Sequence, residues 1–101
     1  MEEIKEITTE ELEKRLNSGE QIELVDVREN EEVAQGMIPG AKHIRMNDIP
    51  ENLDYFSKEK EYIFICRSGM RSENVCHYLQ DQGFKVVNMA GGMLDWKGET
   101  V

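Results

Sequence analysis

The stretch YIFICRSGMRSENVCHYLQDQG, residues 62–83, contains the clearest signals of secondary structure in the chain. It opens with four consecutive apolar residues, YIFI, which are typical of a strand covered on both faces, as central parallel strands are. Its second half places Val75, Cys76 and Leu79 at helical spacing and ends at Gly83, a residue type that often follows the last turn of a helix. The stretch therefore predicts a buried strand that runs through a tight turn, CRSGMRS, into an amphipathic helix.

The segments on either side continue the alternation of helices and strands. Thr8 and Glu11 have the spacing of a capping box, which predicts that a helix begins at Thr9. The further predicted elements are a helix 9–17, a strand 22–27, a short helix 31–35, a partly exposed strand 42–46, a loop with a turn or two of helix 48–56, a strand 85–89 and a short helix that begins within 91–97. This order indicates a single α/β domain with a parallel sheet and helices on both faces. Ligands bind to such sheets beyond the carboxyl ends of the strands, and Cys66 falls at one of these ends.

The composition narrows the classes of protein to which the chain can belong. Its 101 residues suffice for one domain, residues 1–101, with one core. The formal net charge is −9, and residues 1–32 carry 12 acidic and 4 basic side chains, which we interpret as a solvated face. Binding to nucleic acid or to an anionic membrane is therefore not expected. No run approaches the roughly 18 apolar residues of a membrane span, and the acidic first residues do not resemble a targeting segment, so we expect a cytoplasmic protein.

The turn CRSGMRS, residues 66–72, has the composition of a site for an anionic sulfur. A turn from a strand into a helix directs several backbone N–H groups and the positive end of the helix dipole toward one point. If Cys66 points there, its thiolate is stabilised and its pKa falls. Arg67 and Arg71 add two positive charges with planar donors that suit oxyanions. This pattern favours a nucleophilic cysteine.

Smaller residues complete the predicted turn. Gly69 supplies the backbone freedom that a tight turn requires. Ser68 and Ser72 offer hydroxyl donors, and Ser72 is also a candidate cap for the helix that follows. Met70 lies at the tip, where it either contacts an acceptor molecule or packs against the helix.

The remaining cysteine and the two histidines have plainer interpretations. Cys76 lies on the apolar stripe of its helix and is expected to fill the core. The two cysteines show neither a CxxC pattern nor the spacing of zinc ligands, so neither a structural disulfide nor a metal site is expected. Cys66 could also be a packed, inert thiol, although such a thiol has no use for two nearby arginines. His43 and His77 are candidate bases, but their spacing ties neither of them to Cys66, and we assign both to packing or solvation.

Four segments of the chain resemble the rhodanese family, and specifically its single-domain sulfurtransferases. These segments are LVDVRENEE (24–32), GMIPGAKHI (36–44), IFICRSGMRS (63–72) and AGGMLDW (90–96). The resemblance implies a parallel five-stranded sheet flanked by helices, with Cys66 as the sulfur-carrying residue of a six-residue loop, 66–71. Met37 departs from the histidine that is usual in the family, at a position that belongs to a folding motif. Asp26 and Arg28 are interpreted as a charge pair that organises the ends of the loops rather than as substrate contacts.

The implied reaction is a two-step transfer of sulfur through a persulfide on Cys66, without a cofactor. A small anionic donor such as thiosulfate would bind at the loop, and a thiophilic acceptor, either cyanide or a cellular thiol or protein, would remove the sulfur. The residues expected to bind the substrate are Arg67, Ser68, Gly69, Met70, Arg71 and Ser72.

Two alternatives remain open at the level of sequence. The same cysteine chemistry would serve a persulfide relay module that passes sulfur to a biosynthetic partner protein. Phosphatases and arsenate reductases also place a cysteine and an arginine in one turn. Here four residues separate Cys66 from Arg71, one fewer than in the tyrosine-phosphatase signature, which disfavours a loop that wraps a phosphate.

Overall fold

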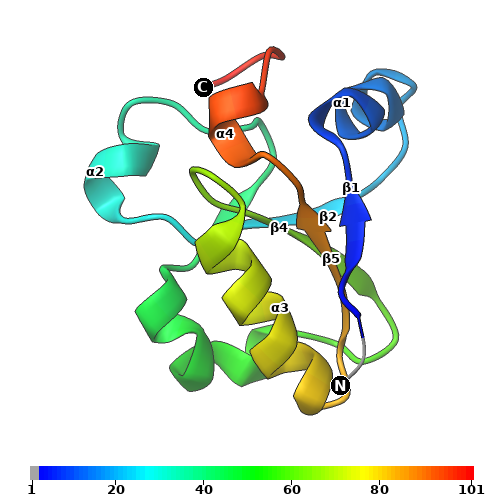
Figure 1. Ribbon diagram of the computed structural model, residues 1–101, viewed down its shortest axis with the longest axis vertical. Coiled ribbons are helices and arrows are strands. Elements are labelled where there is room, and N and C mark those ends of the chain that lie inside the picture. Colours follow the sequence, from blue (N-terminus) through cyan, green and yellow to red (C-terminus); the bar gives the residue numbers. More distant parts are fainter. Residues whose placement is uncertain (1–2) are drawn as a thin grey trace.

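Five parallel strands form one sheet at the centre of the structure (Figure 1). The computed structural model describes residues 3–101, and within them the strands follow the spatial order β1-β5-β4-β2-β3. Their bounds are β1 (Lys5–Ile7), β2 (Glu23–Asp26), β3 (Lys42–His43), β4 (Glu61–Ile65) and β5 (Lys85–Met89). All neighbouring pairs are parallel, and β4 lies between β2 and β5. The central place of β4 agrees with its continuous apolar sequence.

Helices cover both faces of the sheet, which confirms the predicted α/β class. Their bounds are α1 (Thr9–Asn17), α2 (Asn30–Val33), the 3₁₀ segment η1 (Met46–Tyr55), α3 (Met70–Asp81) and α4 (Gly92–Asp95). Side chains of α1 and α4 belong to the core on one face, and those of α3 and η1 belong to the core on the other. The capping box at the start of α1 is also confirmed, because the backbone N–H of Glu11 donates to the Thr8 hydroxyl at 3.1 Å.

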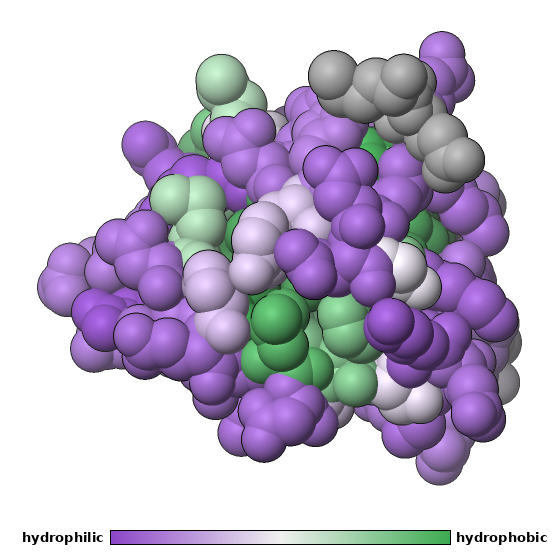
Figure 2. Space-filling model, turned by 90° about the horizontal axis from the view of Figure 1, so that it is seen from below, coloured by the Kyte–Doolittle hydropathy of each residue, from purple (hydrophilic) through white to green (hydrophobic). Residues whose placement is uncertain are grey.

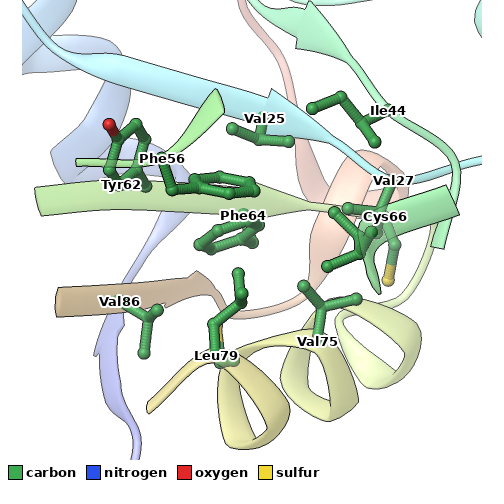
Figure 3. Packing of buried hydrophobic residues seen from close by; sticks show 12 residues of the cluster. Val25, Val27, Ile44, Phe56, Tyr62, Phe64, Cys66, Val75, Leu79 and Val86 are labelled. Carbon is green, nitrogen blue, oxygen red and sulfur yellow. The ribbon is translucent and has the colours of Figure 1, made fainter. Parts of the chain in front are cut away.

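The side chains of β4 alternate between these two cores. Tyr62 and Phe64 face α3 and η1, and Figure 3 shows them beside Phe56 on the side of the sheet that carries Leu79. Phe56 meets Tyr62 edge to face, with 4.9 Å between the ring centroids. The isoleucines of β4, Ile63 and Ile65, face α1 and α4 instead. Because both faces of β4 are packed, the strand holds the next residue, Cys66, in a defined position.

Several of the predicted elements differ from the structure in extent. The helix predicted at 31–35 is α2, Asn30–Val33, and the strand predicted at 22–27 is β2, Glu23–Asp26. The predicted strand 42–46 is wrong beyond His43. The chain there leaves the ladder, while the N–H groups of Ile44 and Met46 still donate to the carbonyl groups of the last residue of β2 and of the residue after it, at 3.0 and 2.9 Å.

A short edge strand, β1, has no counterpart among the elements predicted from periodicity. It comprises three residues, pairs with β5, and buries one side chain, Ile7. A strand of this length has too few residues to show an alternating pattern. The resemblance to the rhodanese family nevertheless implied five strands, and five are present.

Met37, which stands where the family usually has histidine, is half-buried and anchors the end of the described chain. Its N–H donates to the carbonyl of Val101 at 3.0 Å, and the N–H of Val101 donates back to its carbonyl at 2.8 Å. The backbone of this position therefore joins the segment after α2 to the end of the described chain.

The face seen from below Figure 1 is largely hydrophilic, and Figure 2 shows polar residues around a small apolar patch on it. None of the helices within residues 3–101 is both long and apolar enough to cross a membrane. The predicted reactive residues lie in the turn between β4 and α3.

Candidate active site

Cys66 lies at the carboxyl end of β4, where the chain turns into α3. Its side chain is fully buried, and Figure 3 shows its sulfur directed toward α3. The N–H of Gly69 donates to Sγ at 3.0 Å, and the hydroxyl of Ser72 lies 3.3 Å from Sγ. The turn therefore directs donors at the sulfur, as the sequence predicts.

Gly69 is the residue that makes this turn feasible. It has φ = 100° and is the N-cap of α3, a backbone conformation that residues with a Cβ adopt only with strain. The expectation that Ser72 caps the helix is wrong. Because α3 begins at Met70, Ser72 lies inside its first turn and points inward to the sulfur.

Asn88 of β5 completes the buried surroundings of Cys66. Its Nδ2 donates to the carbonyl of Gly69 at 3.0 Å, and its Oδ1 lies within hydrogen-bonding distance of the Ser72 hydroxyl. This residue belongs to none of the motifs described above. A usable signal exists in KVVNM, where one amide stands among apolar residues of a buried strand, because buried polar groups need partners.

The structure shifts the pKa values of the two cysteines in opposite directions. Burial opposes ionisation of Cys66, but hydrogen bonds from the Ser72 hydroxyl and from the N–H groups of Ser72, Gly69 and Ser68 outweigh burial and lower the pKa of this thiol. Burial raises the pKa of Cys76, which packs in the core beside Val75 as predicted. Both are free thiols, and Cys66 is the one that the structure prepares for ionisation.

Arg71 forms an ion pair with Glu32, which belongs to the acidic segment 1–32 that was interpreted as a solvated face. Its two terminal nitrogens donate to the two carboxylate oxygens of Glu32 in α2, both at 2.7 Å. This pairing lowers the pKa of Glu32 to about 2, because the hydrogen bonds from Arg71 favour the ionised carboxyl group. Glu32 thus occupies the terminal donors of Arg71, so an anion at the turn would have to compete with this carboxylate for them.

The ion pair between Asp26 and Arg28, predicted from the DVR segment, holds α2 in place. Arg28 binds the buried Asp26 carboxylate through Nη2 at 2.8 Å and through Nε at 3.0 and 3.1 Å. The same Nη2 also donates to the carbonyl of Gly36 at 2.8 Å. Arg28 therefore ties the end of β2 to the segment that follows α2, and so positions the helix that carries Glu32.

The start of α4 supports the turn from the other side. The N–H of Met93 donates to the carbonyl of Cys66 at 2.9 Å, and the N–H of Leu94 donates to that of Arg67 at 3.0 Å. Gly92 allows this close approach, since a Cβ at this position would lie 2.3 Å from the Arg67 carbonyl oxygen. The segment AGGMLDW is thus a backbone support for the sulfur-bearing turn.

The other residues of the turn form its exposed rim. Arg67 and Ser68 are exposed, and 72% of the surface of Met70 is accessible. Beside Arg67 a hollow of about 450 Å³ is lined also by Glu32, Met93, Trp96 and Lys97. A larger hollow of about 630 Å³ lies at the far ends of the strands, next to Glu23 and Glu61, which are the first residues of β2 and β4.

The two histidines lie apart from the sulfur. The Nε2 atom of His43 is 2.7 Å from the carbonyl of Arg28, and His77 lies 3.7 Å from Glu73 on the same helix. Within residues 3–101, neither histidine forms a hydrogen bond with Cys66. The interpretation of both as packed or solvated side chains agrees with these contacts.

Comparisons with known proteins agree with the fold. The chain is 62% identical over 98 residues to the protein named Putative sulfurtransferase YtwF of Bacillus subtilis (strain 168), covering 97% of this chain and 95% of that protein. It is 34% identical over 77 residues to Thiosulfate sulfurtransferase GlpE of Coxiella burnetii, covering 75% and 72%. The crystal structure of a rhodanese-like domain protein from Staphylococcus aureus superposes with a TM-score of 0.90 at 45% identity, covering 95% and 94%. The family model of the rhodanese-like domain matches residues 8–99. The chain therefore belongs to the family of rhodanese-like domains.

Proposed function

We propose that this protein is a sulfurtransferase that carries sulfane sulfur as a persulfide on Cys66. The observation that carries the proposal is the surroundings of the sulfur, which receives hydrogen bonds from Gly69 and Ser72 at the start of α3. These donors lower the pKa of the thiol despite its burial. A thiolate held in this way is both a nucleophile and a good leaving group, and sulfur transfer requires both properties.

The first half-reaction would load the sulfur. The thiolate of Cys66 attacks the outer sulfur of thiosulfate, an S–S bond forms at Sγ, the S–S bond of thiosulfate breaks, and sulfite leaves with the electron pair. In the second half-reaction a thiophilic acceptor attacks the outer sulfur of the persulfide, and Cys66 leaves as a thiolate. No proton has to be moved between ionised partners, so the chemistry needs no histidine near the sulfur.

An anionic donor suits the rim of the turn. Arg67 is exposed and lines the hollow of about 450 Å³ together with Lys97 and the carboxylate of Glu32. The name of the Coxiella relative supports thiosulfate as this donor. We assign Arg67 and the N–H groups of Ser68 and Gly69 to donor binding. Arg71 contributes to the same role by neutralising the carboxylate of Glu32, which would otherwise repel an anionic donor.

Access to the sulfur is controlled by its burial. Cys66 has no exposed surface, so a donor reaches Sγ only when side chains at the rim of the turn move aside. A buried thiolate is also protected from oxidation and from unproductive acceptors. We expect this rim movement to be part of every turnover.

A protein acceptor is the main alternative to a small one. The exposed side chains of Met70 and Leu94 lie at the rim, at the start of α3 and in α4 respectively, and apolar side chains of this kind serve as contacts for a partner. The persulfide relay is therefore the second candidate function. It uses the same Cys66 chemistry and differs only in the acceptor.

The decisive experiment is intact-mass measurement after incubation with thiosulfate, without reducing agent. We expect a gain of one sulfur atom, located on Cys66 by peptide mapping and removed by cyanide with release of thiocyanate. The Cys76→Ala variant should behave as the wild type. The absence of any adduct would overturn the proposal, and rapid turnover of an aryl phosphate without an adduct would favour a phosphatase instead.

A further inference from the structure

The side-chain amide of Asn88 is fixed in one orientation beside the sulfur-bearing turn. Asn88 is only 1% exposed, and its Nδ2 donates to the carbonyl of Gly69 at 3.0 Å. The amide oxygen Oδ1 must then face the hydroxyl of Ser72, which it contacts. The carbonyl of Gly69 also accepts from the N–H of Glu73 at 3.1 Å, so this carbonyl does not depend on Asn88 alone.

The hydroxyl of Ser72 therefore has one hydrogen and two neighbouring acceptors. One acceptor is Oδ1 of Asn88, and the other is the Cys66 sulfur, 3.3 Å away. If Cys66 is a thiol, its S–H donates to Ser72 and the hydroxyl donates to Asn88, so every group has a partner. If Cys66 is a thiolate, both neighbours of the hydroxyl are acceptors, and one of them lacks a hydrogen. Thiolate and amide oxygen then compete for the same donor.

We propose that Asn88 is a positioning residue that sets the direction of the Ser72 hydroxyl, and that this hydroxyl rotates between the Cys66 sulfur and Asn88 as charge leaves and returns to the sulfur. This inference rests on the proposed function and deepens it. The N–H of Gly69 is part of the backbone and stays directed at Sγ. The hydroxyl of Ser72 is the adjustable donor, and Asn88 is its resting acceptor.

The direction of the Ser72 hydroxyl changes with the charge on Sγ during the two half-reactions. When the thiolate of Cys66 forms its bond to the outer sulfur of the donor, the negative charge moves from Sγ to the terminal sulfur of the persulfide. Because Sγ is then no longer charged, the Ser72 hydroxyl rotates back to donate to Asn88. When an acceptor removes the terminal sulfur, the charge reappears on Sγ, and the hydroxyl rotates back to stabilise the leaving thiolate.

The other charged and titratable groups near the turn can be held constant. The charged ones are Arg67 in the turn, Arg71 with its partner Glu32, and the ion pair of Asp26 and Arg28 at the end of the adjacent strand β2. The titratable one is the neutral thiol of Cys76 in α3. Substitutions at Ser72 and Asn88 change none of these groups. Working in a Cys76→Ala background leaves Cys66 as the single thiol of the chain.

The test is a double-mutant cycle on the thiolate of Cys66. The four proteins carry Cys76→Ala alone, with Asn88→Leu, with Ser72→Ala, and with both, and the ultraviolet absorbance of the thiolate is titrated against pH without any sulfur donor. Asn88→Leu removes the competing acceptor and should raise the ratio of thiolate to thiol by about 2- to 10-fold, the effect of one net hydrogen bond. Ser72→Ala should lower this ratio by a similar factor. In the Ser72→Ala background, Asn88→Leu should have no further effect.

An equal shift from Asn88→Leu in both backgrounds would overturn the proposal, because Asn88 would then act through Gly69 and the shape of the turn. An unchanged ratio in the presence of Ser72 would overturn it as well. Asn88→Ala, which adds no bulk, is titrated in parallel and decides the question if the leucine variant does not fold. Since the titration needs no sulfur donor, it is independent of the proposed function: a missing persulfide leaves the coupling measurable, and a missing coupling leaves persulfide formation untouched.

Discussion

The carboxylate of Glu32 binds both terminal guanidinium nitrogens of Arg71, across 39 positions of the chain. The two side chains are 27% and 31% exposed, so this pair is partly shielded from solvent. The two hydrogen bonds run side by side, which is the bidentate geometry that the planar guanidinium group favours. The pair links α2 to the first turn of α3, and thereby connects the segment held by Arg28 to the sulfur-bearing turn.

Replacing Glu32 by Gln should make the free energy of unfolding less dependent on pH in the acidic range. The pKa of Glu32 is lowered to about 2 in the folded protein, below its ordinary value, so the pair contributes stability that is present above about pH 4.5 and is lost as the pH falls toward 2. Near pH 6 we expect Glu32→Gln to be less stable by about 1–2 kcal/mol, discounted for partial exposure. Urea unfolding from pH 6 to pH 3 measures the difference, which should shrink as the pH falls.

The matched control for this prediction is Glu31→Gln, which removes an exposed carboxylate from the same helix. Its stability should follow the wild type at every pH. If Glu32→Gln and the wild type differ by a constant amount over the whole range, the pair does not titrate as its geometry requires.

Removing Arg71 should impair the use of an anionic donor by leaving Glu32 unpaired near the turn. In Arg71→Ala the carboxylate of Glu32 keeps its negative charge, which repels thiosulfate, and a cationic donor is lost. We expect kcat/KM for thiosulfate to fall by about 10- to 100-fold, as for a lost hydrogen bond to a charged group. The double variant Glu32→Gln/Arg71→Ala should recover part of this loss. Steady-state kinetics with thermal unfolding as a check on folding measures both effects, and unchanged donor kinetics in Arg71→Ala would remove its role.

The sequence predicts best those parts of the structure that rest on local pattern and burial. β4 is apolar on both faces because it lies in the middle of the sheet, and α3 shows a helical stripe because one side of it packs on that sheet. The place of Cys66 between them follows directly. The capping box at Thr8 is equally local, and it is present.

Contacts between residues far apart in the sequence cannot be predicted from such local patterns. The charge count of residues 1–32 suggests a solvated face, and it contains no sign that Glu32 turns inward to Arg71. Likewise Ser72 reads as a helix cap until the start of α3 at Met70 places it inside the first turn. Only the tertiary arrangement brings Asn88 of β5 to the same turn, 16 and 19 positions away from its two partners.

The two cysteines should differ completely in their importance for catalysis. Cys66→Ser removes the sulfur that carries the persulfide, so thiosulfate:cyanide sulfurtransfer should fall to the uncatalysed rate. Cys76 is a core side chain whose pKa is raised by burial, and Cys76→Ala should retain most of the activity while losing about 1 kcal/mol of stability. Thiocyanate formation measures the activity. Undiminished activity in Cys66→Ser would reject the assignment of the nucleophile.

Gly92 and Gly40 offer a comparison between a crowded and an open glycine. Both have positive φ, 61° and 86°, so alanine is strained at either position. A Cβ on Gly92 would lie 2.3 Å from the carbonyl oxygen of Arg67 and 2.6 Å from that of Cys66, whereas a Cβ on Gly40 would meet no atom of the described chain within 4 Å. We expect Gly40→Ala to cost about 1 kcal/mol and Gly92→Ala about 2–4 kcal/mol, because only the second must displace backbone.

The backbone displacement in Gly92→Ala should also affect sulfur loading at Cys66. The carbonyl groups that Gly92→Ala would push aside belong to Cys66 and Arg67, and the N–H groups directed at the sulfur follow in the same turn. Persulfide formation should therefore slow in Gly92→Ala at temperatures where the variant remains folded, and stay unchanged in Gly40→Ala. Urea unfolding and the rate of sulfur loading, measured on both variants, separate strain from crowding. Equal losses of stability and equal rates would mean that the close packing of α4 against the turn contributes nothing to either.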